Sequence, residues 1–114
     1  MNRFLLAGLF VLAGCGVPCE NTIKTSVASP DGKYMATAFI RDCGATTDFS
    51  PQVYLRLAGE PLAEIGNVFI GNHSDDIGIK WLSPSNLVIY SECEVVMHRT
   101  NHLGVAIEVR QIAN

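Results

Sequence analysis

Residues 19–43 read CENTIKTSVASPDGKYMATAFIRDC, and this stretch decides how the chain begins to fold. At its centre, SPDG at 29–32 combines a proline whose φ is already set with an aspartate and then a glycine that accepts positive φ. This order is typical of a three-residue hairpin loop, in which a left-handed residue follows a type I turn. The pattern predicts two antiparallel strands joined by a loop of residues 30–32.

The length of this loop predicts the register of the hairpin, because Ser29 then lies opposite Lys33 and paired numbers sum to 62. The pairs expected on one face are Val27 with Met35, Ile23 with Phe39, and Cys19 with Cys43. All six side chains are apolar or cysteine, as a buried face requires.

The two opposed cysteines predict a disulfide between Cys19 and Cys43. Opposed residues at a non-hydrogen-bonded site lie about 4.5 Å apart at Cα, which a disulfide can span. The bond closes a loop of about 25 residues and is expected to stabilise the fold by about 3 kcal/mol. The alternative is a pair of free buried thiols, and the mass shift on reduction and alkylation separates the two.

Short runs rich in Val, Ile, Tyr, Phe and Thr recur along the rest of the chain and are separated by turn residues. They predict strands at 21–28, 33–42, 52–58, 63–70, 77–82, 87–92, 95–100 and 105–111. In the last strand, Val105, Ile107 and Val109 are expected on the opposite face from Ala106, Glu108 and Arg110. We expect an all-β fold, an antiparallel meander of about eight short strands that forms a sandwich or open barrel as a single domain over 21–114.

A second turn, SPSN at 83–86, has the same form, with asparagine at the left-handed position. Paired numbers then sum to 170, so Trp81 is expected opposite Ile89 and Ile79 opposite Ser91. Cys93 is expected on the same face as the tryptophan, as a small buried hydrophobe.

The N-terminal residues 1–16, MNRFLLAGLFVLAGCG, indicate export. Arg3 precedes a short apolar run, which is below the roughly 20 residues needed to span a bilayer but suits a secretory signal. The tetrad LAGC at 12–15 resembles the lipobox of bacterial lipoproteins, which implies cleavage after Gly14 and a diacylglyceryl group on Cys15. On this interpretation residues 1–14 are a lipoprotein signal peptide and 15–20 a lipidated anchor with a short tether. The alternatives are an ordinary signal peptide or a buried N-terminal helix.

The residue after the lipidated cysteine is Gly16 rather than Asp. By the sorting rule of enteric lipoproteins, this predicts an outer-membrane location facing the periplasm.

The chain has 114 residues, enough for one domain, with 8 Lys+Arg, 11 Asp+Glu and a net charge of -3. This weakly acidic balance argues against nucleic acid as a partner.

The motifs SPDGKY at 29–34 and RDCGATT at 41–47, followed by IKWL at 79–82 and LVIY at 87–90, make the chain similar to a family of small uncharacterised bacterial proteins, many of them lipoproteins. The resemblance covers most of residues 19–91. It implies a fold and an envelope location but supplies no activity.

Three groups of residues are candidate sites. Cys93, His98 and His102 are ligand types for zinc or copper, although 93 and 98 have opposite strand parity and His102 is expected in a turn. His73, Asp75 and Asp76 could bind a hard cation, but a solvated turn accounts for them better. The loop that follows the disulfide offers backbone donors, hydroxyls and a carboxylate to a partner, from Gly44, Thr46, Thr47 and Asp48.

No common catalytic motif occurs, so we expect no enzyme and no cofactor. The sequence favours a lipid-anchored envelope protein that acts as a binding or interaction module, with the membrane and an envelope protein as partners. The alternatives are a metal-binding protein that uses the Cys93 group, an inhibitor of a cell-wall hydrolase, and a structural envelope component.

Overall fold

The computed structural model describes residues 18–44 and 48–111, and these residues form nine strands and no helix. The strands are β1 (Glu20–Ala28), β2 (Tyr34–Asp42), β3 (Ser50–Leu57), β4 (Phe69–Asn72), β5 (Gly78–Ser83), β6 (Asn86–Tyr90), β7 (Glu94–His98), β8 (Asn101–His102) and β9 (Val105–Arg110). The predicted all-β fold is confirmed. The predicted signal peptide, Cys15, Thr46 and Thr47 lie outside the described residues.

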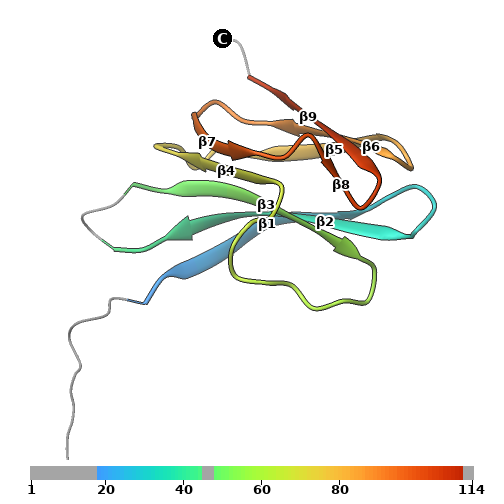
Figure 1. Ribbon diagram of the computed structural model, residues 1–114. Helices are drawn as coiled ribbons and strands as arrows, with labels where there is room; N and C mark the ends of the chain where they lie inside the picture. The colour runs from blue at the N-terminus through green and yellow to red at the C-terminus, as the bar shows by residue number, and fades with distance from the viewer. Residues whose placement is uncertain (1–17, 45–47, 112–114) are drawn as a thin grey trace, which may run out of the picture.

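The strands form two layers arranged as an open sandwich (Figure 1). Sheet A has the order β1-β2-β3-β4-β7, and sheet B has the order β5-β6-β9-β8. All neighbouring strands are antiparallel except β6 and β9, which are parallel. The predicted simple meander is therefore wrong at its C-terminal end, where β7 joins the edge of sheet A before the chain returns to sheet B. Strand patterning does not report which strands are neighbours.

The core lies between the inner faces of the two sheets. Sheet A and the residue before β4 supply Ala36, Ala38, Ile40, Val53, Leu55, Val68 and Phe69, and sheet B supplies Leu87, Ile89, Val105 and Ile107, all nearly inaccessible to solvent. Burial of each large apolar side chain stabilises the fold by about 1.5–3 kcal/mol. The alternation predicted for β9 is confirmed, since Val105 and Ile107 are buried and the residues between them are exposed.

The first hairpin contains the predicted disulfide, with the Cα atoms of Cys19 and Cys43 4.0 Å apart. The pairing sum of 62 holds from Glu20–Asp42 to Ile23–Phe39. Nearer the turn the sum is 63, because the loop has four residues rather than three: the Ser29 amide donates to the Tyr34 carbonyl. The prediction missed both the fourth loop residue and a β-bulge at Lys24. These two errors cancel, because the extra residue in β1 offsets the extra residue in the loop and the pairing sum returns to 62 between the bulge and the cysteines.

The longer loop has a local cause in the side chain of Asp31. Its carboxylate accepts hydrogen bonds from the Ser29 hydroxyl (2.7 Å) and from the Lys33 amide (3.1 Å), and both lower the pKa of Asp31. Gly32 takes the positive φ of 76° that the turn requires, as expected.

The bulge also divides the face that was predicted to be shared by the hairpin's apolar residues. Val27 pairs with Ala36, whose side chain is in the core, whereas Ile23 pairs with Phe39 on the outer face of sheet A, the face away from sheet B. The prediction that Val27 faces Met35 on one continuous surface with Ile23 is wrong, because an extra residue in a strand reverses the alternation beyond it.

The second hairpin has a different register from the one predicted. Trp81 pairs with Leu87 rather than with Ile89, and Ile79 pairs with Ile89. The shift is even, so the same side chains still face the core, and Cys93 packs against them as predicted.

The turn of this second hairpin is short because Asn86 starts β6 instead of taking a left-handed conformation. The Ser83 hydroxyl accepts hydrogen bonds from the Asn86 side-chain amide at 2.7 Å and from the Ser85 amide at 3.3 Å. These bonds stabilise a turn of Pro84 and Ser85 alone.

Residues 58–68, of which the second half was predicted as a strand, form a long connection that crosses the outer face of sheet A (Figure 1). The Glu64 carbonyl accepts hydrogen bonds from Asn21 Nδ2 and from Arg41, each at 2.9 Å. The Gly66 amide donates to Gln52 Oε1 at 2.8 Å. Phe39, on the same face, is 1% exposed. Side chains of strands distant in sequence hold this connection through hydrogen bonds. Its path could therefore not be predicted from the local sequence pattern of residues 58–68.

Candidate functional site

The predicted partner loop lies at the end of the sandwich where β1 begins, here termed the entry end (Figure 1). Of its four residues, Gly44 and Asp48 are described. The Gly44 amide donates to the Asp42 carboxylate at 3.1 Å, and the disulfide fixes the residue before it. The loop therefore leaves the sheet from a covalently held position.

Asp48 is joined to two other segments through His73. The imidazole Nδ1 is hydrogen-bonded to the Asp48 carboxylate, and Nε2 lies 3.2 Å from Glu94 Oε1. The three residues come from the β2–β3 connection, the β4–β5 connection and the start of β7, and all three side chains are more than half exposed. His73 reaches both carboxylates from a left-handed backbone conformation, with φ of 61°.

The two carboxylates raise the pKa of His73, chiefly through the hydrogen bond that the ring donates to Asp48 and then through the charges of Asp48 and Glu94. The protonated ring can donate one N–H to each carboxylate. Because both nitrogens are engaged, neither is free to act as a base on a substrate while the bridge persists. The arrangement is an ion bridge that connects three segments.

The sequence singled out His73 with the wrong partners. Asp75 and Asp76 lie on the same connection, but the ring is bridged to residues 25 and 21 positions away along the chain. Asp76 contributes its backbone instead, donating its amide to the Ser74 hydroxyl and accepting from Ser91. No sequence signal marks Asp48 and Glu94 as neighbours of His73, because the contact depends on the order of strands in sheet A.

The bridge belongs to a strongly acidic surface. Seven of the eleven carboxylate residues of the chain lie at the entry end: Glu20, Asp42, Asp48, Asp75, Asp76, Glu92 and Glu94. The His73 ring lies among them, and Arg110, at the end of β9, is paired with Glu108. The opposite end of the sandwich consists of the short turns that follow β1, β5 and β8.

The proposed zinc or copper ligands do not come together as a ligand set. Cys93 packs against the core, His98 Nε2 donates to the Ile107 carbonyl at 3.0 Å, and His102 Nε2 lies 3.3 Å from Asn67 Nδ2. Among the described residues no group of three or more His, Cys, Asp or Glu side chains could hold a metal ion.

The surroundings of His102 favour its neutral form. Burial, and then the charge of Arg99, lower its pKa. The neutral Nε2 can accept the hydrogen bond from Asn67, whose amide also donates to the Leu55 carbonyl. This histidine therefore has a structural role beside β3.

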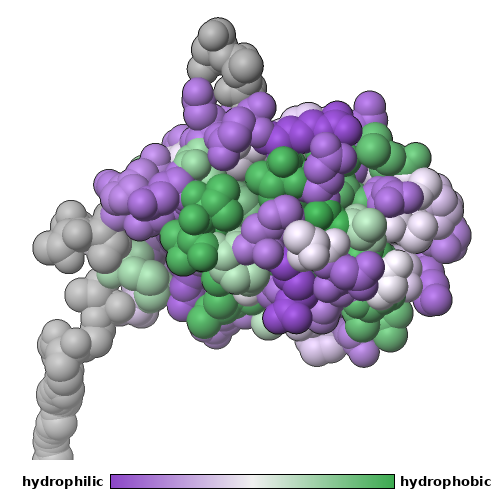
Figure 2. Space-filling model, turned by 45° about the horizontal axis from the view of Figure 1, so that its top comes forward, coloured by the Kyte–Doolittle hydropathy of each residue, from purple (hydrophilic) through white to green (hydrophobic). Residues whose placement is uncertain are grey.

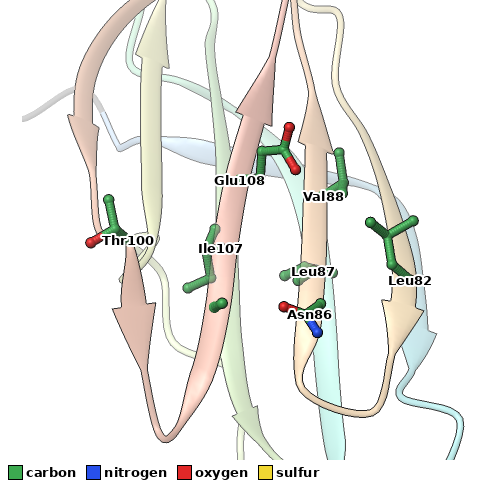
Figure 3. Close-up of a pocket in the computed structure, with 8 residues that line it drawn as sticks. Leu82, Asn86, Leu87, Val88, Thr100, Ile107 and Glu108 are labelled. Atoms are coloured by element: carbon green, nitrogen blue, oxygen red, sulfur yellow. The ribbon is translucent and has the colours of Figure 1, made fainter.

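A shallow hollow lies on the outer face of sheet B, above the parallel pair β6 and β9 (Figure 3). It is lined by Leu82, Asn86, Leu87, Val88, Thr100, Ala106, Ile107 and Glu108 and has a volume of about 160 Å³. Small-molecule sites usually enclose about 300–1,000 Å³. The hollow forms where Ala106 lies opposite Asn86, and its size suits one side chain rather than a cofactor.

The rest of the surface seen from above sheet B alternates between hydrophilic and apolar areas (Figure 2). The large apolar side chains that are exposed there and elsewhere are Ile23, Phe49, Leu57, Leu62, Ile65, Leu82, Val95, Val96 and Leu103. The described residues include no helix with the length and hydropathy that a membrane span requires.

Comparison with known proteins places the chain in a family without assigning it an activity. Neither the curated proteins nor the solved structures contain a significant match. A family model described as a family of unknown function, DUF5412, matches residues 10–102 and so spans β1 to β8, including the disulfide hairpin and the His73 bridge. The chain, an open all-β sandwich with an acidic entry end, therefore belongs to the DUF5412 family of unknown function.

Proposed function

We propose that this protein is a lipid-anchored component of the bacterial envelope that acts as a binding module. The observation that carries the proposal is the Cys19–Cys43 disulfide, which lies four residues after the LAGC tetrad. Structural disulfides persist in oxidising compartments such as the periplasm. The bond and the lipobox-like sequence are independent features, and both are expected of an exported protein.

The anchor follows from the chemistry of Cys15. Acylation of its sulfur and of the new amino group provides two or three acyl chains, and each buried methylene contributes about 0.8 kcal/mol to membrane binding. With Gly16 rather than Asp at the second position, the cargo is sorted to the outer membrane and faces the periplasm.

A role in binding is favoured over catalysis by the entry end. The disulfide fixes the residue before Gly44, and the His73 bridge holds Asp48, so both described residues of the predicted partner loop are anchored to the sandwich. Binding residues often lie on loops that a rigid scaffold positions. The partner is an envelope protein, and a cell-wall hydrolase is one such class.

Metabolic labelling with palmitate tests the anchor. The wild-type protein is expected to incorporate label and to fractionate with membranes, whereas Cys15→Ala loses both. Cys93→Ala is the matched control, because it removes a cysteine outside the LAGC tetrad and keeps the label. An unlabelled wild-type protein that retains its N-terminal methionine would refute the proposal.

Photo-crosslinking in intact cells tests the partner loop. A photoreactive residue in place of Asp48 is expected to give a discrete adduct with an envelope protein. The same residue in place of Asp31, in the turn at the opposite end, is the control. Equal adducts from both positions, or none from Asp48, would exclude the loop as the binding surface.

A further inference from the structure

We propose that the domain lies on the bilayer that holds its anchor and docks through the outer face of sheet A. This inference rests on the proposed lipidation of Cys15. The docking surface, termed the outer patch, consists of Ile23 on β1 and of Leu62 and Ile65 on the connection that follows β3. Its occupant is the lipid surface itself.

The outer patch is apolar and open to solvent. Ile23 is 56% exposed, Ile65 is 55% exposed and Leu62 is 37% exposed. Exposed apolar side chains that gather on one face are typical of an interaction site.

Hydrogen bonds hold the connection that carries Leu62 and Ile65 against the outer face of sheet A, the face on which Ile23 lies. The Glu64 carbonyl accepts from Asn21 and Arg41, which form the pair next to Ile23 and Phe39 in the outward-facing row of the hairpin. Ile65 follows Glu64 directly, so it is fixed beside β1. Gly66 is then held against Gln52, which prevents the connection from moving off the sheet.

The length of the tether brings this face to the membrane. Cys15 precedes Cys19 by four residues, which span at most about 14 Å when fully extended. The disulfide fixes Cys19 to the end of β2, so the anchor cannot gain length by unpairing β1. Ile23 is four further residues along the strand, about 13 Å. The patch is therefore within reach of the lipid headgroups when the domain lies on its side.

Charge selects this orientation over the upright one. An upright domain would press the seven carboxylates of the entry end against the headgroups, and anionic lipids repel them. Beside Ile23 on this face lies Arg41, whose guanidinium donates to the Asn21 side chain and to the Glu64 carbonyl, so the face presents a cation to anionic lipids. The tether keeps the entry end near the membrane in either orientation, but docking on the patch buries apolar surface and brings the membrane to one side of that end instead of to the whole of it.

The test uses the full acylated protein in vesicles of phosphatidylethanolamine and phosphatidylglycerol, in a Cys93→Ala background that leaves no other free thiol. An environment-sensitive fluorophore is attached through Ile65→Cys or, as the control, through Asp31→Cys in the distant β1–β2 turn. A quencher carried on the lipid chains is expected to quench the label at position 65 at least threefold more than the label at position 31.

A charged substitution then separates docking from anchoring. In proteins labelled through Ile65→Cys or Asp31→Cys, the further substitution Ile23→Asp is expected to abolish the difference in quenching between positions 65 and 31. Val96→Asp is the matched control, because Val96 is 62% exposed on β7 at the other edge of sheet A and should leave the difference unchanged. Both positions are exposed, so both variants are expected to fold, and circular dichroism checks this.

The outcomes distinguish the two proposals. If the wild-type protein does not float with the vesicles, the anchor itself is wrong. If it floats but both labels are quenched equally, or if the label at position 65 self-quenches through a second copy of the chain, the anchor stands and docking through the outer patch is refuted.

Discussion

Removal of the Cys19–Cys43 disulfide is expected to produce a large loss of stability, and the structure sets its size. The bonded residues are 24 positions apart, so the bond closes a loop of about 25 residues. The chain-entropy relation gives about 3.5 kcal/mol for a loop of that length at 25 °C. Small domains have a total stability of about 5–15 kcal/mol, so the double variant Cys19→Ala/Cys43→Ala should lose a substantial fraction of it.

The effect should be concentrated in β1. Most of this edge strand is exposed, so its side chains contribute little burial. Its pairing with β2, the disulfide and the contact of Trp81 Nε1 with the Val27 carbonyl (3.0 Å) hold it in place. Without the disulfide, the half of β1 near Cys19 should fray, and its amide hydrogens should exchange faster than those of β2.

Urea unfolding monitored by fluorescence measures the loss, because Trp81 is the single tryptophan and stacks on Tyr34. The urea midpoint should fall, the slope should rise because the unlinked denatured chain exposes more surface, and the thermal midpoint should drop by about 14–28 °C. Cys93→Ala is the control for loss of a cysteine without loss of the bond. A change below about 1 kcal/mol in the double variant would refute the argument from loop closure.

Three further predictions concern packing and charge. Phe39→Ala should destabilise the fold by about 3–5 kcal/mol in urea unfolding because the ring is 1% exposed, whereas Ile23→Ala at its exposed partner should change it by less than about 1 kcal/mol. Gly66→Ala should cost about 1–3 kcal/mol, since a Cβ there would lie 2.7 Å from a backbone carbonyl; Gly78→Ala, with 4.0 Å of clearance, is the control, and equal effects would contradict the clash. The raised pKa of His73 means that its bridge stabilises the folded state fully below about pH 6.5 and less as pH rises through the folded pKa. The gap in urea midpoint between wild type and His73→Gln should therefore be larger at pH 5.5 than at pH 8.5, and a gap independent of pH would exclude the bridge.

The parts of the fold that depend on local chemistry could be predicted from sequence. SPDG located the first hairpin, and alternation in β9 identified Val105 and Ile107 as core residues. The second hairpin had the correct face but the wrong pairs, because its turn is stabilised by the Ser83 hydroxyl rather than by a left-handed Asn86. Alternation constrains faces more strongly than it constrains partners.

The parts that depend on distant contacts could not be predicted. The bulge at Lys24, the pairing of β7 with β4 and the path of residues 58–68 are determined by the packing of the whole domain. The His73 bridge is of this kind, since its two carboxylates become neighbours only when sheet A is complete. The partner role of the loop at 44–48 stays a prediction, and the residues that contact its Asp48 come from the β4–β5 connection and from β7.

The parallel pairing of β6 with β9 constrains the order in which the molecule can assemble. β1, β2 and β3 are joined in sequence by short connections and can associate as soon as they are available. β6 must wait for a partner that lies 20 positions further along the chain, after two intervening strands have been placed. Until then one of its edges is open, and open edges are templates for association between molecules. We therefore expect that interruption of the chain before residue 105 leaves an aggregation-prone product, even though most of the core residues are already present.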